Sequence, residues 1–210
     1  MPTLPSCSES EDTVIARTRS WLETAVIGLN LCPFAKAVHV REQIGYRVSR
    51  ATGTTELADE LRNALRELAA ADAAKLDTVL LIHPHVLGDF TDYNAFLAQA
   101  DRIVRKLRLE GELQVASFHP DYQFADTDAN DVDNATNRSP YPMLHLLRES
   151  SIQRAVASYP DPERIYARNI ASLRKLGWTG WQTLADKWGP ASKLASEPAS
   201  ARDARSENTE

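Results

Sequence analysis

Two apolar segments of the chain end in the same dipeptide, His-Pro. His83 follows "TVLLI" and His119 follows "LQVASF". If both segments are neighbouring parallel strands, their carboxyl ends meet at the edge where open α/β sheets bind ligands. Imidazole transfers protons near neutral pH, so both histidines are candidates for acid–base chemistry. The alternative is that each His-Pro only terminates a strand and leaves a half-buried histidine.

The same histidines could bind a metal instead. His83 and His85 share a face if the extended conformation continues through Pro84. With His119, and with a carboxylate such as that of Asp121, they would suit zinc or iron. The sequence has neither an HExxH motif nor a CxxC pair. A bound divalent metal therefore stays an open alternative, and acid–base chemistry needs none.

Cys32 is the candidate nucleophile. It precedes Pro33, so its thiol could lie at the start of a short helix, where the helix dipole lowers a thiol pKa. Together with His119 and His145 it would form a catalytic group. The alternative is that Cys32 is a small buried apolar residue.

The segment "NRSPYPMLHLLRE", residues 137–149, predicts a capped helix that carries polar side chains. Ser139 is a suitable N-cap and Pro140 a suitable first helical residue. Because Pro140 and Pro142 lack the amide hydrogens of an anion site, arginine side chains would have to hold an anion. Alternatively, the arginines balance the acidic loop before them. The residues that we expect to bind an anionic substrate are Asp121, Asn137, Arg138, Ser139, Tyr141 and Arg148.

The elements expected to position these residues alternate between helix and strand. Apolar spacing predicts helices at 10–30, 54–70, 90–111, 139–152 and 161–176. It predicts strands at 38–48, 77–83 and 112–119. This order favours an α/β fold, a sheet of three or slightly more strands with flanking helices and a C-terminal helical segment. A ferredoxin-like α+β fold is the alternative.

Length and composition limit the class of protein. The 210 residues suit one α/β domain at 10–189, between tails at 1–9 and 190–210 that we expect to be disordered. A net charge of −5 argues against nucleic-acid binding. There is no apolar run of about 18 residues, which a membrane span needs. Two distant cysteines fit a reducing cytoplasm. The sequence leaves the oligomeric state open.

Three segments make the chain similar to a known family. "AVIGLNLCPFAKAV", "SFHPDYQFADT" and "NRSPYPMLHLLRE" together resemble a family of bacterial proteins of unknown function and similar length. The resemblance covers residues 12–188 and leaves out both tails. It implies that the three segments belong together as a signature, and it implies no reaction, cofactor or partner.

The leading functional hypothesis is an enzyme, a hydrolase or group transferase that acts on a small anionic substrate. It requires Cys32, His119 and His145 to line one concave pocket. One alternative is a sensor module that binds a metal or small ligand without turnover. Another is an interaction protein, which requires exposed tryptophans near the C-terminal end, at Trp178, Trp181 and Trp188.

Overall fold

A four-stranded sheet forms the middle of the computed structural model, which describes residues 9–188. The strands are β1 (Ile44–Val48), β2 (Thr78–Ile82), β3 (Leu113–Phe118) and β4 (Met143–Arg148), in the order β1-β2-β4-β3. The tails expected at 1–9 and 190–210 lie outside the described residues, apart from Glu9. The expected α/β class is confirmed, with one strand more than the sequence predicted.

The sheet is mixed. β1 and β2 are parallel, whereas β4 is antiparallel to both of its neighbours, β2 and β3. β2 and β3 therefore point in the same direction with β4 between them. Their carboxyl ends reach the same edge of the sheet, as the sequence predicted, but the two strands are not adjacent.

The helix predicted at 139–152 is wrong, because its first half is strand β4 and only Glu149–Ala157 is helical, as α5. Met143, Leu144 and Leu146 are fully buried between β2 and β3. A short apolar run buried on both faces of a sheet carries no periodicity that separates it from a buried helix. Ser139 and Pro140 accordingly precede a strand and cap nothing.

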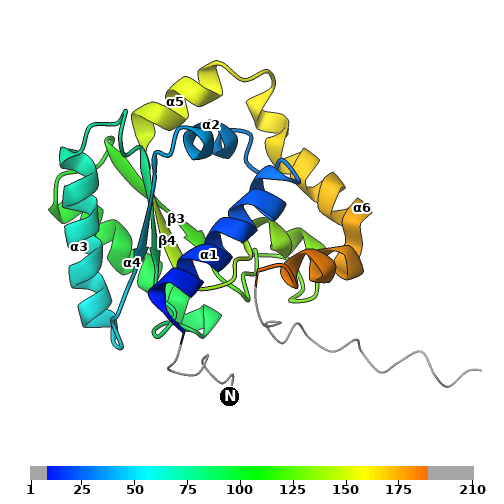
Figure 1. Ribbon diagram of the computed structural model, residues 1–210, viewed down its shortest axis with the longest axis horizontal. Helices are drawn as coiled ribbons and strands as arrows, with labels where there is room; N and C mark the ends of the chain where they lie inside the picture. The colour runs from blue at the N-terminus through cyan, green and yellow to red at the C-terminus, as the bar shows by residue number, and fades with distance from the viewer. Residues whose placement is uncertain (1–8, 189–210) are drawn as a thin grey trace, which may run out of the picture.

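Helices cover both faces of the sheet. Figure 1 shows α3 (Thr54–Ala70) and α4 (Phe90–Lys106) on one side, and α1 (Glu11–Trp21) and α6 (Ile165–Ala185) on the other. The shorter helices are η1 (Leu22–Ile27), α2 (Ala35–Val40), η2 (Val132–Asn137) and η3 (Pro162–Arg164). In residues 9–188, no helix combines the length and apolar character that a membrane crossing requires.

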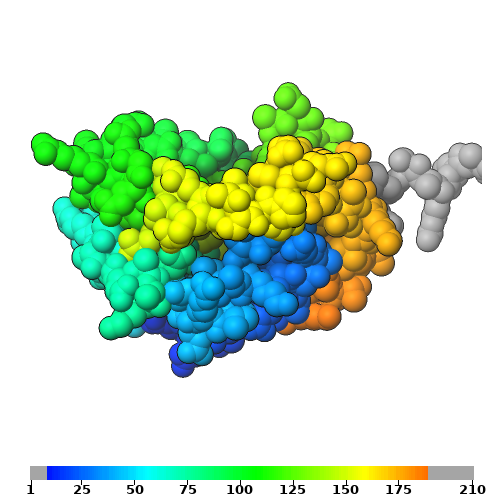
Figure 2. Space-filling model, turned by 90° about the horizontal axis from the view of Figure 1, so that it is seen from above, coloured from blue at the N-terminus to red at the C-terminus, as the bar shows by residue number. Residues whose placement is uncertain are grey.

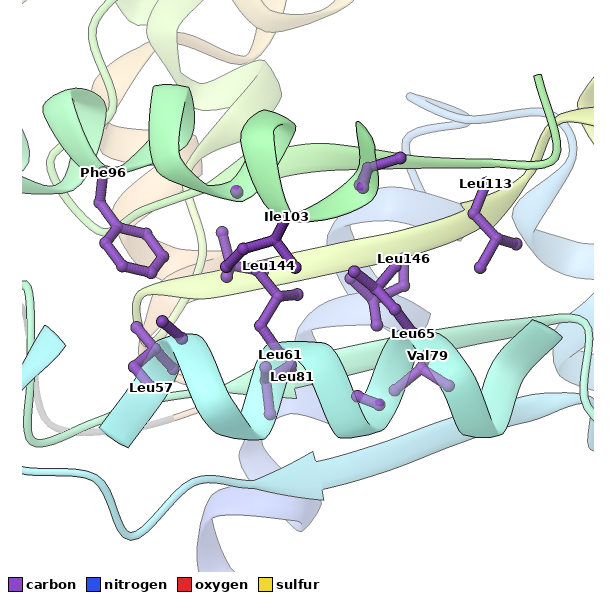
Figure 3. Packing of buried hydrophobic residues seen from close by; sticks show 14 of the residues in the cluster. Leu57, Leu61, Leu65, Val79, Leu81, Phe96, Ile103, Leu113, Leu144 and Leu146 are labelled. Carbon is purple, nitrogen blue, oxygen red and sulfur yellow. The ribbon is translucent and has the colours of Figure 1, made fainter. Parts of the chain in front are cut away.

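The predicted leucine stripe of α3 forms the core on its side of the sheet. Leu57, Leu61 and Leu65 are inaccessible to solvent and face Leu81 and Leu144 on the strands (Figure 3). The second core, on the other side, is built around Trp21 of α1. The sheet is thus covered by a hydrophobic core on each face.

The strand expected at 38–48 begins later than predicted. Val38 and Val40 lie in α2, and only Ile44–Val48 is extended, as β1. Val40 is exposed. Its spacing of two from Val38 therefore does not mark the buried face of a strand.

Helix α6 is interrupted at Gly177, which has φ 66° and ψ 174°. Residues other than glycine strongly disfavour this region of φ and ψ. An added Cβ would meet no atom within 4 Å, so the cost is conformational only. We expect Gly177→Ala to lower the free energy of unfolding by about 1–3 kcal/mol in chemical denaturation.

The matched control for Gly177→Ala is Gly53→Ser. Gly53 has φ −139° and ψ 160°, and a Cβ there also meets open space. Serine is a favoured N-cap, so this variant should lose no stability. Equal losses in both variants would contradict the conformational explanation.

Candidate functional site

His83 and His119 lie at the same edge of the sheet, against one ring. Tyr93 of α4 stacks on His83 at 5.8 Å between centroids and lies 5.0 Å from His119. The Tyr93 hydroxyl donates to Met143 O (2.8 Å) and accepts from Phe118 N (3.0 Å). Tyr93 therefore joins β3 and β4 and holds both histidines on the α4 side of the sheet.

The nitrogen atoms of these histidines face the protein interior. His119 Nδ1 accepts from Asp121 N (3.0 Å), and Nε2 donates to Leu87 O (3.1 Å). His83 Nδ1 donates to Val86 O (2.9 Å), and its buried Nε2 has no partner among the described residues. Burial lowers the pKa of His119, and it lowers the pKa of His83 to about 4. Both imidazoles are neutral parts of the core.

His145 lies on the opposite face of the sheet. It alternates with Leu144 and Leu146, which belong to the α3–α4 core, so it points away from that core. Thr78 Oγ1 donates to Leu146 O (2.6 Å), so His145 Nε2 must donate to Thr78 (2.7 Å). Burial lowers the pKa of His145 to about 4. His119 packs against Tyr93 on the α4 side, so the structure places His145 and His119 on opposite faces of the sheet.

Cys32 packs with the Trp21 core rather than in an open pocket. Burial raises the pKa of its thiol, and the backbone N–H groups of Phe34 and Ala35 offset that rise only in part. The direction is opposite to the one expected from a helix dipole. The three predicted catalytic residues, Cys32, His119 and His145, are thus not brought together.

The predicted metal ligands do not converge. β2 ends at Ile82 and the chain turns at Pro84 and His85, so His83 and His85 do not share a strand face. Within residues 9–188, no group of three or more His, Cys, Asp or Glu side chains could hold a metal ion.

The two predicted anion-binding arginines bind backbone carbonyls instead. Arg138 donates to Tyr122 O (3.2 Å) and Ala129 O (2.8 Å), and burial lowers its pKa. Arg148 donates to Leu68 O, and to Ala71 O at 2.7 Å, at the C-terminal end of α3. Each guanidinium thus ties backbone carbonyls of a neighbouring segment to its own strand or turn; Leu68 O also accepts from Ala71 N (3.2 Å).

The remaining predicted binding residues are also engaged locally. Asn137 Nδ2 donates to Ser117 O (3.1 Å), and Ser139 Oγ donates to Tyr141 O (2.7 Å). The Tyr141 hydroxyl donates to Glu9 (2.6 Å), and burial raises its pKa to about 12. Asp121 is exposed, and its charge acts on Arg138 and His119.

The tryptophans near the C-terminal end pack into the molecule. Trp181 and Trp188 are buried and meet edge to face at 5.7 Å. Trp178 is half-buried, donates to Asn130 O and lies 5.0 Å from the guanidinium of Arg138. They therefore do not form an exposed docking surface.

One hollow that could hold a ligand lies between the loop at 29–33 and helix α6. We call it the α6 hollow, and its volume is about 240 Å³. Figure 2 shows the segment of α5 and the residues after it lying against the N-terminal part of the chain and the start of α6. The lining residues are Leu29, Asn30, Pro33, Tyr159, Ile165, Arg168, Asn169, Ala171 and Ser172.

The polar residues that line the α6 hollow differ in solvent exposure. Arg168, Asn30 and Ser172 are exposed, and the Arg168 guanidinium lies 5.2 Å from the centroid of the Tyr159 ring. Asn169 is only 5% exposed, and its Nδ2 donates to Leu31 O (2.8 Å). The exposed guanidinium of Arg168, with the polar side chains of Asn30 and Ser172 beside it, can bind a small anion.

A second hollow of about 200 Å³, the β1–β2 hollow, lies at the carboxyl ends of those parallel strands. Its charges largely satisfy one another. Glu9 accepts from Arg17 and from Tyr141, and Glu11 lies 3.7 Å from Arg50. The full lining is Glu9, Glu11, Val14, Val48, Ser49, Arg50, Pro84 and His85.

Sequence reasoning missed the polar residues of α6. Asn169 stands between Ile165 and Leu173 at a spacing of four, so it is a polar residue on the buried stripe of a helix. A buried polar position on such a stripe requires a partner and signals a site or a helix contact. This signal was present in the sequence.

Fold and site together define an α/β protein with a mixed sheet and a small polar hollow beside its last helix. The chain belongs to the family described as "Protein of unknown function (DUF1415)", which matches residues 13–183. The resemblance inferred from the three segments is thereby confirmed. A search of the curated proteins found no match, and a search of the solved structures found none either.

Proposed function

We propose that this protein binds a small anionic molecule in the α6 hollow. The observation that carries the proposal is the charge of the lining: of its nine described residues, Arg168 alone is charged. Its guanidinium packs against Tyr159 and offers a planar set of donors to a carboxylate or phosphate. Asn30 and Ser172 add neutral hydrogen-bonding groups.

Binding without turnover is the form of this proposal that the chemistry favours over hydrolysis or group transfer. The described lining of the α6 hollow includes no His, Cys, Asp or Glu, so it offers neither a usual general base nor a thiol nucleophile. Cys32 lies between the lining residues Asn30 and Pro33 in sequence but packs inward. A cytoplasmic location is also part of the proposal, because the sequence has only two cysteines and they lie far apart.

Titration with inorganic phosphate at low ionic strength tests the proposal. We expect calorimetry to show stoichiometric binding that Arg168→Met weakens tenfold or more, because hydrogen bonds to a charged group contribute about 1.5–3 kcal/mol. Arg164→Met is the matched control, since Arg164 lies one turn earlier and does not line the hollow. Equal weakening in both variants would mean nonspecific charge attraction, and no binding to the wild type would refute the proposal.

Catalysis is the second candidate, at the β1–β2 hollow, because His85 lines it together with two glutamates. A panel of phosphate and carboxylate esters tests this. Hydrolysis that His85→Gln abolishes and Arg168→Met leaves intact would favour it, and its absence across the panel would argue against it.

A further inference from the structure

The carboxylate of Glu9 is held by two donors at the β1–β2 hollow. Arg17 donates to one Glu9 oxygen, and the Tyr141 hydroxyl donates to the other at 2.6 Å. Arg17 also donates to the Tyr141 oxygen at 3.2 Å, which directs the single hydroxyl hydrogen toward Glu9. Burial raises the pKa of Tyr141 to about 12, so the hydroxyl keeps this hydrogen at neutral pH. The Arg17–Tyr141 pair thus presents donors to both oxygens of one carboxylate.

The Arg17–Tyr141 pair is positioned by the fold and not by Glu9. Arg17 lies within α1, and the N-cap of this helix is Ser10, whose side chain accepts from the first turn. Tyr141 is 4% exposed and packs in the Trp21 core, just before strand β4. Both donors should therefore keep their places when the Glu9 side chain is removed.

Glu9 lies between the Arg17–Tyr141 pair and the β1–β2 hollow. It lines the hollow, whereas neither Arg17 nor Tyr141 is among the lining residues. Without the Glu9 carboxylate, the buried Tyr141 hydroxyl would lose its acceptor, and buried polar groups almost always have a partner. The charges of Arg17 and Arg50 would then face only that of Glu11. Both effects favour an anion from solution in place of Glu9.

We infer that the Arg17–Tyr141 pair is a binding site for small carboxylates and that Glu9 closes it as an internal ligand. A carboxylate is the group whose two oxygens the pair binds in the structure. A carboxylate that enters through the β1–β2 hollow must displace Glu9, whose attachment to α1 gives it a high effective concentration. The site shares no lining residue with the α6 hollow, so it stands whether or not that hollow binds an anion.

Acetate titrations of the wild type and of Glu9→Ala, followed by NMR at constant ionic strength, test this inference. In Glu9→Ala we expect saturable chemical-shift changes at Arg17 and Tyr141, with an affinity about tenfold or more above that of the wild type, because no tethered carboxylate competes. Glu11→Ala is the matched control. Glu11 also lines the hollow and its loss removes the same charge, but its described partner is Arg50, at 3.7 Å. This control should bind acetate no better than the wild type.

Three results would overturn the inference. The first is an acetate affinity at Arg17 and Tyr141 that Glu9→Ala leaves at the wild-type level. The second is an equal gain in Glu11→Ala, since net charge alone would then explain it. The third is a gain that Tyr141→Phe leaves unchanged in the Glu9→Ala protein.

Thermal denaturation gives a second readout if Glu9→Ala folds poorly. Acetate should raise the melting temperature of this variant above its value in chloride, because a ligand that binds only the folded state stabilises it. The wild type should melt at the same temperature in both salts. Equal responses of the two proteins to acetate would also contradict the inference.

Discussion

Arg148→Met lowers the free energy of unfolding by about 3 kcal/mol or more. The Arg148 side chain donates to Leu68 O, Ala71 O and Leu76 O, where α3 ends and the chain turns toward β2. Each carbonyl left without a donor costs about 1–3 kcal/mol where it is buried. Loss of a cation at the C-terminal end of a helix adds to this. Methionine keeps much of the side-chain volume, so the loss reports on the hydrogen bonds.

Urea denaturation of the variant and of Arg47→Met measures this effect. Arg47 is a largely exposed arginine in β1 whose only described charged partner is Glu67, at 3.4 Å. Its replacement should change stability by less than about 1 kcal/mol. If Arg148→Met kept full stability and lost ligand binding, the substrate-binding role predicted from the sequence would be right and the structural role wrong.

Acidification from about pH 6.5 to pH 4 is expected to remove up to about 6 kcal/mol of stability through His83, which is buried, and His145, which is partly buried. His83 and His145 each have a pKa lowered from 6.5 to about 4 by burial. The unfolded chain takes up a proton near pH 6.5 and the folded chain only near pH 4, so the unfolded state gains protons first as the pH falls. The stabilisation is complete above about pH 6.5 and is lost toward pH 4. Each histidine contributes about 3 kcal/mol.

Denaturation curves at several pH values test this in the wild type and in His145→Gln, which cannot be protonated. The variant should lose about 1.4 kcal/mol less per pH unit between pH 6.5 and 4. Carboxylates titrate in both proteins and cancel in the comparison. His39→Gln is the control, because the His39 side chain is partly exposed and lies 3.3 Å from Glu23. Identical pH dependence in wild type and His145→Gln would contradict a buried neutral imidazole at this position.

The spacing of apolar residues in the sequence correctly predicted an element that buries only one of its faces, helix α3. The stripe of Leu57, Leu61 and Leu65 recurs at helical spacing, and α3 has the predicted bounds. The run "MLHLLR" failed because it is buried between two strands, so tertiary pairing with β2 and β3 decided its conformation. No pattern within the run itself could indicate that pairing.

The candidate site was harder to predict than the fold. The repeated His-Pro correctly indicated that His83 and His119 reach one edge of the sheet. The sequence could not predict the hydrogen-bond partners of their ring nitrogens. These partners are the carbonyl oxygens of Val86 and Leu87, whose positions depend on the folded chain. Their residue type suggested acid–base chemistry. In the structure, three of the four ring nitrogens bind backbone groups, and the fourth, His83 Nε2, is buried.

Amide chemical-shift mapping with inorganic phosphate tests the central claim, anion binding in the α6 hollow, most directly. The proposal predicts saturable shifts confined to residues 29–33 and 165–172, including the side-chain amide of Asn169. Shifts confined to residues 48–50 and 84–85 would place the site in the β1–β2 hollow and contradict the proposal. So would a spectrum that phosphate leaves unchanged.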